Sequence, residues 1–218
     1  MLIALMALLH VLVFVYWLGG DLGAFYISRH VSDPTRPAAA RIAAAQALNN
    51  LDMAPRTALI LALPTGLALA QARGILALPT VVMLAVCLVT AVWLALAWRI
   101  HLKHLPPGST VRTLDLAIRW VALTGLLGVG GAVLLGQVDA PLFIGLKLMV
   151  LGAAVATGLW VRRLLQPFGP AFVTLVSQGP SPETDAVIAR SLARVRPAVM
   201  LIWLLLLTAA FLGLWRPQ

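Results

Sequence analysis

The chain has 218 residues, of which 61% are hydrophobic and only 11% are charged, and its formal net charge is +9. Soluble domains carry about 25% charged residues, so this composition excludes an ordinary soluble domain and indicates an integral membrane protein. The basic residues stand between apolar segments, where they orient a membrane protein, and this placement argues against a nucleic-acid partner. The one cysteine, Cys87, excludes a disulfide within the chain and a cysteine metal cluster.

Six segments are apolar and long enough to cross a bilayer, which takes about 20 residues of helix. They predict an all-α membrane helix bundle that forms a single transmembrane domain, residues 1–218. The predicted spans are roughly 2–28, 53–72, 77–100, 114–136, 141–164 and 196–215. The first span has no basic residues before it and no small-residue cleavage site after it, so we expect it to be retained and not removed as a signal peptide.

Two of the connections are long enough to hold helices of their own. The Ala-rich segment 29–52 follows the first span, and we expect an interfacial helix there. The loop before the last span ends in a pattern typical of a helix that is capped by Ser181 or Thr184.

Charge bias orients the six predicted spans. Most Lys and Arg residues fall in the first, third and fifth connections or beside them: Arg29, Arg36, Arg41, Arg56, Arg99, Lys103, Arg112, Arg119, Arg162, Arg163, Arg190, Arg194 and Arg196. Basic residues concentrate on the cytoplasmic side of membrane proteins. We therefore expect these connections in the cytoplasm and both termini outside.

His10 and Lys147 lie inside predicted spans, where polar groups are costly and tend to face the interior and to be functional. His10 is roughly 13 Å along the first span, and Lys147 is roughly 9 Å along the fifth. Both spans run inward from the outer side, so the two residues are expected at similar depth. We interpret His10 and Lys147 as candidate catalytic residues. The alternatives are a neutral core histidine and a lysine that extends to the outer surface.

Further polar and aromatic residues share the helix face of His10. Trp17 and Asp21 fall within about 20° of it, and Phe14 lies nearby. Toward the cytoplasmic end, Asp21 is expected to form a structural ion pair with Arg56, at the start of the second span. A role for Asp21 in proton transfer is the alternative.

One further pair of charged residues stands four residues apart at the start of the fourth span. Asp115 and Arg119 are spaced for a salt bridge along one helix face. We expect this salt bridge at the membrane interface.

Several segments resemble a known family. "HVLVFVYWLGG", "MAPRTALILALPTGLALA", "PLFIGLKLMVLGAAVATGLWVRRLLQP" and the last span are similar to the HemJ/CopD-like superfamily of bacterial membrane proteins, which includes HemJ-type protoporphyrinogen oxidases and CopD-type copper-resistance proteins. The resemblance implies a multi-pass protein of the bacterial inner (plasma) membrane that binds heme b. Carried over by position, it implies functional roles for His10 and Lys147, with Trp17 and Gly20 completing the first motif.

Three functions remain open from the sequence. The first is a heme b-binding oxidoreductase or electron-transfer protein: His10 ligates the metal, Phe14 and Trp17 wall the ring, Gly20 and Lys147 complete the site, and electrons pass to quinone or a redox partner. The second is copper handling, with Met6, His10 and Met149 as donors. The third is a non-catalytic subunit of a homo-oligomer or a larger membrane complex.

Overall fold

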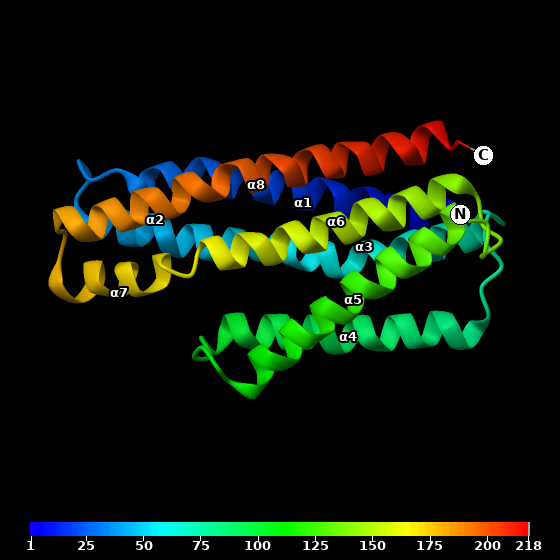
Figure 1. The fold of residues 1–218 in the computed structure, drawn as a ribbon, viewed down its shortest axis with the longest axis horizontal. Helices are drawn as coiled ribbons and strands as arrows, with labels where there is room; N and C mark the ends of the chain where they lie inside the picture. Colours follow the sequence, from blue (N-terminus) through cyan, green and yellow to red (C-terminus); the bar gives the residue numbers. More distant parts are fainter. Residues whose placement is uncertain (218) are drawn as a thin grey trace.

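The computed structural model describes residues 1–217, and these form a bundle of helices without a strand (Figure 1). The apolar composition dictates this outcome, because a helix satisfies all of its backbone hydrogen bonds within one lipid-exposed segment. The helices in chain order are α1 (Leu2–Ser32), α2 (Ala38–Leu51), α3 (Met53–Ala72), α4 (Thr80–Leu102), α5 (Thr110–Leu134), α6 (Leu142–Leu164), α7 (Phe168–Gln178) and α8 (Pro182–Trp215).

Within the described residues, six helical segments are long and apolar enough to cross a membrane, as the sequence predicts. Their outward surfaces are apolar, with Leu88 on α4, Val121 on α5 and Leu204 on α8 each 60% exposed or more. Water would disfavour such a surface, whereas lipid chains would solvate it. The chain is therefore a multi-pass membrane protein.

The bounds of two spans differ from the prediction. A separate interfacial helix was expected at 29–52, but this segment contains the end of α1 and the whole of α2. Helix α2 is continuous with α3, and together they form one 35-residue apolar segment, Ala38–Ala72. The backbone explains the continuity, because the Asp52 amide donates to Leu48 O at 2.9 Å and Asp52 O accepts from the Arg56 amide. The helical hydrogen-bonding pattern thus passes through the polar residue that divides the two segments.

Helix α8 begins well before the predicted last span, at Pro182. Ser181 caps it by accepting a hydrogen bond from the Thr184 amide at 3.2 Å, so Ser181 and not Thr184 is the cap. Pro182 has no backbone N–H, so it leaves no unpaired donor in the first turn of the helix. Glu183 and Asp185 in the same turn place negative charge at the positive end of the helix dipole. These signals start a helix in water, and the same helix then continues into the apolar segment.

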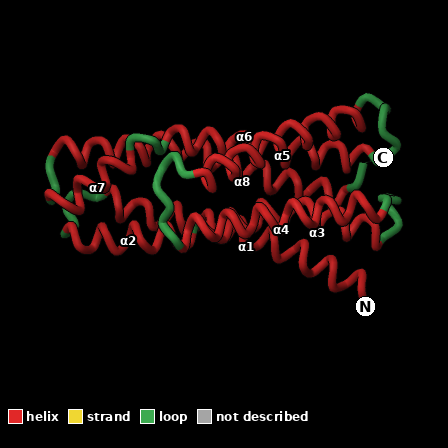
Figure 2. The backbone as a smooth tube through the Cα atoms, turned by 90° about the horizontal axis from the view of Figure 1, so that it is seen from below, coloured by secondary structure: helices red, strands yellow, loops and turns green. Residues whose placement is uncertain are grey.

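Four helices build the centre of the bundle. α1 packs along α3 and α8, and α6 packs along α5 and α8 (Figure 1). The α4–α5 hairpin lies to one side, where α4 contacts α3 and α5 contacts α6. Figure 2 shows the first turns of α1 diverging from the other helices.

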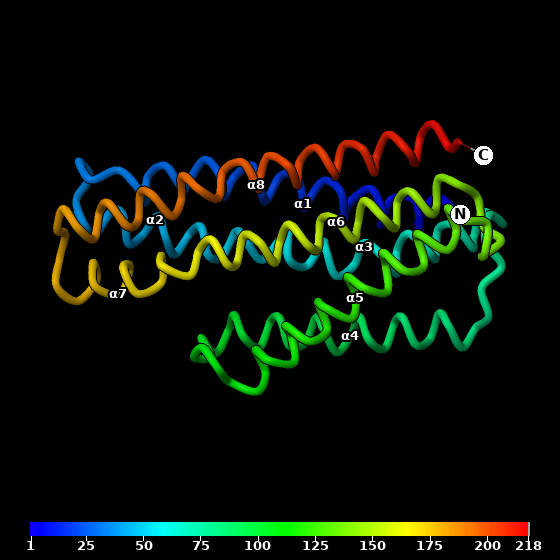
Figure 3. Tube along the Cα trace, in the orientation of Figure 1, coloured from blue at the N-terminus to red at the C-terminus, as the bar shows by residue number. Residues whose placement is uncertain are grey.

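The two ends of the bundle differ in composition. Both termini and the turns 73–79 and 135–141 lie at one end, which we call the termini end (Figures 1 and 3). The α1–α2 and α6–α7 connections and the start of α8 lie at the other, which we call the arginine-rich end. The α4–α5 connection points in the same direction.

A buried cluster closes the middle of the bundle. Trp17 of α1, Ala58 of α3 and Ala154 of α6 meet Ile202 and Leu206 of α8 there, and Trp17 is 5% exposed. We call these five residues the central plug. It brings all four central helices together at one level.

A fully buried arginine joins three helices at the arginine-rich end. Arg41 of α2 donates from Nε to Val31 O at 3.0 Å and from Nη1 to Asp185 Oδ1 at 2.7 Å. Val31 O is in the last turn of α1, where backbone carbonyls lack helical partners. Arg41 therefore connects the end of α1 to the start of α8.

Candidate functional site

A cavity of about 460 Å³ lies on the termini side of the central plug, between α1, α3, α6 and α8. His10 and Lys147, the two candidate catalytic residues of the sequence, both line it. Except for these two, Trp17, Arg73 and Arg216, the lining residues are apolar. Pockets of roughly 300–1,000 Å³ with apolar walls and a few polar groups are typical of small-molecule and cofactor sites. We call this space the termini-side cavity.

The orientation of His10 is set by a neighbouring helix. Its Nδ1 lies 3.0 Å from Thr65 Oγ1 of α3, and the Thr65 hydroxyl donates to Leu61 O at 2.7 Å. A hydroxyl has one proton, so with that proton on Leu61 O, Thr65 Oγ1 accepts a hydrogen bond from His10 Nδ1–H. The geometry therefore places a proton on Nδ1, as in the Nδ1–H tautomer of neutral histidine. This tautomer leaves the lone pair of Nε2 free.

A glycine makes room for the imidazole. A Cβ atom on Gly66 would lie 3.1 Å from His10 Cε1, closer than ordinary van der Waals contact. The ring therefore packs against the bare backbone of α3, one residue after its hydrogen-bond partner Thr65. This contact limits the movement of the ring.

Lys147 is held beside α8 without a polar partner. A Cβ atom on Gly213 would lie 3.0 Å from Lys147 Nζ. Across residues 1–217, its ammonium group has neither a hydrogen bond nor an ion pair, and the cavity lining contains no carboxylate. With Arg73 and Arg216, the cavity therefore presents three basic side chains and no acidic side chain, which suits an anionic ligand.

The other predicted cofactor contacts are only partly at this cavity. Phe14 lines it, and Trp17 closes its floor as part of the central plug. Gly20 does not line it: a Cβ atom there would meet Pro55 Cδ at 2.6 Å and Ala54 Cβ at 3.0 Å. The prediction for Gly20 is thus corrected, because this glycine allows close packing of α1 against α3 and lies away from the cavity.

The methionines of the copper hypothesis do not line this cavity. Met149 faces α5, where its Cγ would lie 3.1 Å from a Cβ atom on Gly130, and neither Met6 nor Met149 lines the cavity. The described residues contain no cluster of three or more His, Cys, Asp and Glu side chains that could hold a metal ion.

A second cavity, of about 200 Å³, lies on the arginine-rich side of the plug. Trp17 and Ala154 line both cavities and separate them. Four arginines and two aspartates line the second one: Arg56, Arg119, Arg162, Arg196, Asp21 and Asp52. We call it the arginine cavity.

The predicted Asp21–Arg56 ion pair is wrong. Arg56 pairs with Asp52, one turn earlier in the same chain segment, and its Nε donates to Asp52 Oδ2 at 2.6 Å. Spacing of four residues on a helix makes Asp52 the nearer partner. Asp21 lines the same cavity, but its buried Oδ2 has no hydrogen-bond partner in residues 1–217.

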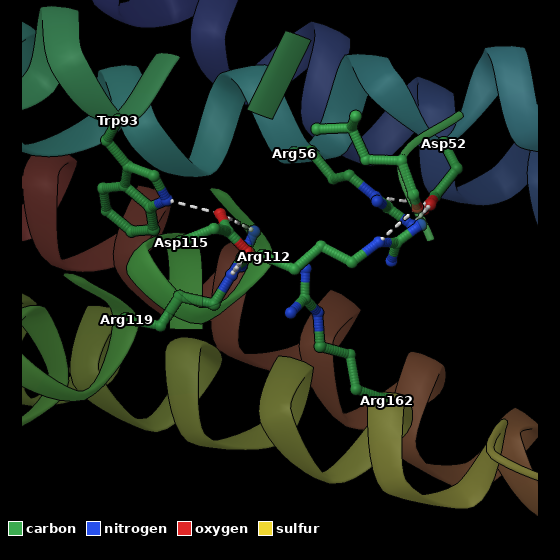
Figure 4. Close-up of polar contacts among 8 residues, drawn as sticks. Asp52, Arg56, Trp93, Arg112, Asp115, Arg119 and Arg162 are labelled. Atoms are coloured by element: carbon green, nitrogen blue, oxygen red, sulfur yellow. Dashed lines mark hydrogen bonds and ion pairs between the residues drawn. The ribbon is translucent and has the colours of Figure 1, made fainter. Parts of the chain in front are cut away.

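The predicted Asp115–Arg119 salt bridge is present, but it is buried and larger than expected. Asp115 is 1% exposed, and it accepts from Arg119 Nε at 3.1 Å and from Arg162 Nη2 of α6 at 2.9 Å. Trp93 Nε1 of α4 also donates to it at 3.0 Å. Figure 4 shows Asp115 between Trp93 and Arg119. The sequence predicted an interfacial pair because the spacing shows neither its burial nor its partners on α4 and α6.

Comparisons with protein-family models, with curated proteins and with solved structures found no match to this chain. The function is therefore inferred from the chemistry of the two cavities.

Proposed function

We propose that the chain is a membrane-embedded heme b protein with a redox or electron-transfer function, related to the HemJ type, in which His10 is the axial ligand. The observation that carries the proposal is the placement of His10: Thr65 Oγ1 accepts a hydrogen bond from its Nδ1–H, which leaves Nε2 free, and the ring lines an apolar cavity. A neutral imidazole whose other nitrogen is fixed by a hydrogen bond is the usual arrangement of a metal-ligating histidine.

The other lining residues also fit a heme. The apolar walls, including Phe14 and Trp17, suit the macrocycle, and its propionate groups require cations. Lys147, Arg73 and Arg216 supply these cations, and Lys147 is free of any competing carboxylate among residues 1–217. A bound heme would supply one-electron chemistry, whereas the chain's residues would hold it, neutralise it and exclude water.

Charge bias supports the orientation of this site. Basic residues are concentrated toward the arginine-rich end, so we place that end in the cytoplasm and the termini-side cavity in the outer half of a bacterial inner membrane. The electron acceptor in this proposal is a quinone or a redox partner within the bilayer. The proposal also includes assembly of the chain into a homo-oligomer or a larger membrane complex.

The optical spectrum of the purified full-length chain tests the proposal. We expect a heme Soret band after expression with sufficient heme supply, and we expect His10→Ala to lose it. His101→Ala is the matched control, because His101 lies at the cytoplasmic end of α4 and does not line the cavity. A wild-type chain that does not shift the Soret band of added heme, or equal heme binding by His10→Ala, contradicts the assignment.

Lys147 provides a second measurement within the same experiment. Lys147→Gln removes a cation from the cavity and keeps a polar side chain of similar length. We expect weaker heme binding by about tenfold, the cost of one charge-assisted hydrogen bond, with the Soret band retained. Unchanged affinity would remove Lys147 from the proposed site while leaving His10 as the ligand.

A further inference from the structure

The arginine cavity has features of a second binding site that heme binding does not use. It lies on the other side of the central plug, and its volume of about 200 Å³ is less than half that of the termini-side cavity. Its lining combines apolar residues with the four arginines. Arginine side chains are costly in the low-dielectric interior of a membrane protein unless they are paired.

The carboxylates present leave part of this positive charge without a partner. Asp52 is occupied by Arg56, and Asp115 is shared between Arg119 and Arg162. No carboxylate pairs with Arg196 in residues 1–217, and its buried Nε lacks a hydrogen-bond acceptor. The four arginines therefore exceed the carboxylates that accept from them.

An aromatic ring holds the side chain of Arg196 in place. Its Cζ lies 5.8 Å from the centroid of the Phe25 ring, so a cation–π contact holds the guanidinium. Phe25 itself packs edge-on against Trp203 at 5.1 Å. Arg162 comes from α6, and its side chain is 37% exposed although one of its nitrogens bonds Asp115. The guanidinium groups of Arg162 and Arg196 thus line one small cavity from different helices, and both have N–H groups that could donate to a ligand.

We propose that the arginine cavity binds an oxyanion, a phosphate or carboxylate group, held by Arg162 of α6 and Arg196 of α8. Guanidinium groups bind such oxygens through charge-assisted and often paired hydrogen bonds. The unpartnered Oδ2 of Asp21 suits a ligand that also carries a hydroxyl, such as monohydrogen phosphate or the headgroup of phosphatidylglycerol. A soluble anion and an anionic lipid share this chemistry, and the cytoplasmic leaflet is rich in anionic headgroups.

The test uses the full chain in nanodiscs of phosphatidylcholine, with inorganic phosphate as the probe and sodium chloride at equal ionic strength as the salt control. The thermal midpoint of the wild type is expected to rise with phosphate concentration. Arg162→Gln and Arg196→Gln are expected to weaken this response about tenfold or more. Each variant is compared with its own phosphate-free midpoint, so that a loss of stability is not mistaken for a loss of binding.

Adjacent arginines provide matched controls. Arg163→Gln and Arg194→Gln remove the same charge from the same two helices, but both residues are exposed and neither lines the cavity. Both controls are expected to respond to phosphate as the wild type does. Equal losses in the controls would overturn the proposal, because the effect would then be one of general charge.

A second arm distinguishes the two sources of the anion. In nanodiscs that contain phosphatidylglycerol, native mass spectrometry measures the lipid that the released protein retains. A lipid headgroup is supported if Arg162→Gln and Arg196→Gln retain less phosphatidylglycerol than the wild type and if the wild type in these nanodiscs no longer responds to phosphate. A phosphate response that persists beside this lipid supports a soluble anion. The absence of both a phosphate response and site-dependent lipid retention would overturn the proposal, whether or not heme binds at His10.

Discussion

His10 derives its chemistry from a side chain on another helix. Thr65 fixes the proton on Nδ1, and Gly66 allows the ring to lie against α3. The sequence predicted His10 and Lys147 because ionisable residues in apolar segments are rare and conspicuous. It could not predict Thr65, since a threonine that bonds its own helix is common in a membrane span, and its contact with His10 depends on how α1 and α3 are rotated.

Replacement of Thr65 by valine tests this role. Valine keeps the branched shape but cannot accept a hydrogen bond, so His10 loses the group that selects its tautomer. We expect heme affinity to fall about 10–100-fold, as for other partners of metal-ligating histidines. Heme titration followed at the Soret band measures the effect, and ¹⁵N NMR of His10 in the heme-free protein reports the tautomer directly.

Thr208→Val is the control for that substitution. Thr208 lies on α8 and donates to Leu204 O at 2.8 Å, so it makes the same bond within its own helix without a histidine nearby. Its replacement is expected to leave the His10 spectrum and heme affinity unchanged. An unaltered ¹⁵N spectrum in Thr65→Val would show that the hydroxyl does not set the tautomer.

At the scale of helices, Asp115 joins α4, α5 and α6 through donors from Trp93, Arg119 and Arg162. Asp115→Asn keeps the volume but removes the negative charge that compensates two arginines. We expect the protein to lose about 3–5 kcal/mol of stability, the cost of leaving a buried charge unpaired. Equilibrium unfolding in mixed micelles measures it, with the exposed Asp139→Asn as a control that should change little.

Arg41 has a similar role for α1, α2 and α8. Arg41→Gln would leave Val31 O and Asp185 without their donor, and it would place a shorter polar group in a fully buried position. Asp185 is partly exposed and can be hydrated, so the expected loss is about 2–3 kcal/mol, less than for a wholly buried pair. Limited proteolysis near residues 33–37 should accelerate, whereas the exposed Arg194→Gln on α8 should leave it unchanged. Equal protection in both variants would refute the role of Arg41.

The sequence predicted the membrane-spanning helices better than their ends. Hydropathy detects segments that lie in lipid, but it does not detect where a helix continues beyond them. The sequence therefore predicted the helix capped by Ser181, but it missed the continuity of that helix with the last span and the continuity at Asp52. The sequence also predicted the salt bridge between Asp115 and Arg119 but not that this salt bridge is buried. Pairing with Arg162, 47 residues away, depends on the packing of α5 against α6.

At the scale of the whole molecule, the bundle contains two cavities that are lined by basic side chains among apolar ones, with a thin apolar barrier between them. Trp17→Ala would remove most of that barrier and leave a void among Ala58, Ala154 and Ile202. We expect a loss of about 3–5 kcal/mol of stability, as for other buried tryptophans. We also expect the joined cavities to conduct protons across liposomes, measured with a pH-sensitive dye under an imposed potential.

Trp160→Ala is the control for the conductance measurement. Trp160 is on α6 and is 49% exposed on the outer surface of the bundle, away from both cavities. Its replacement should leave the liposomes sealed. Sealed liposomes with a folded Trp17→Ala variant would show that other residues separate the cavities.

The central plug also has an electrical consequence. Water that filled the two cavities would concentrate the membrane voltage across the layer of apolar side chains between them. One elementary charge that crosses 100 mV changes in energy by about 2.3 kcal/mol. An electron or proton that moved past Trp17 would therefore experience most of the membrane potential in a single step, and the rate of that step would depend on the energised state of the cell.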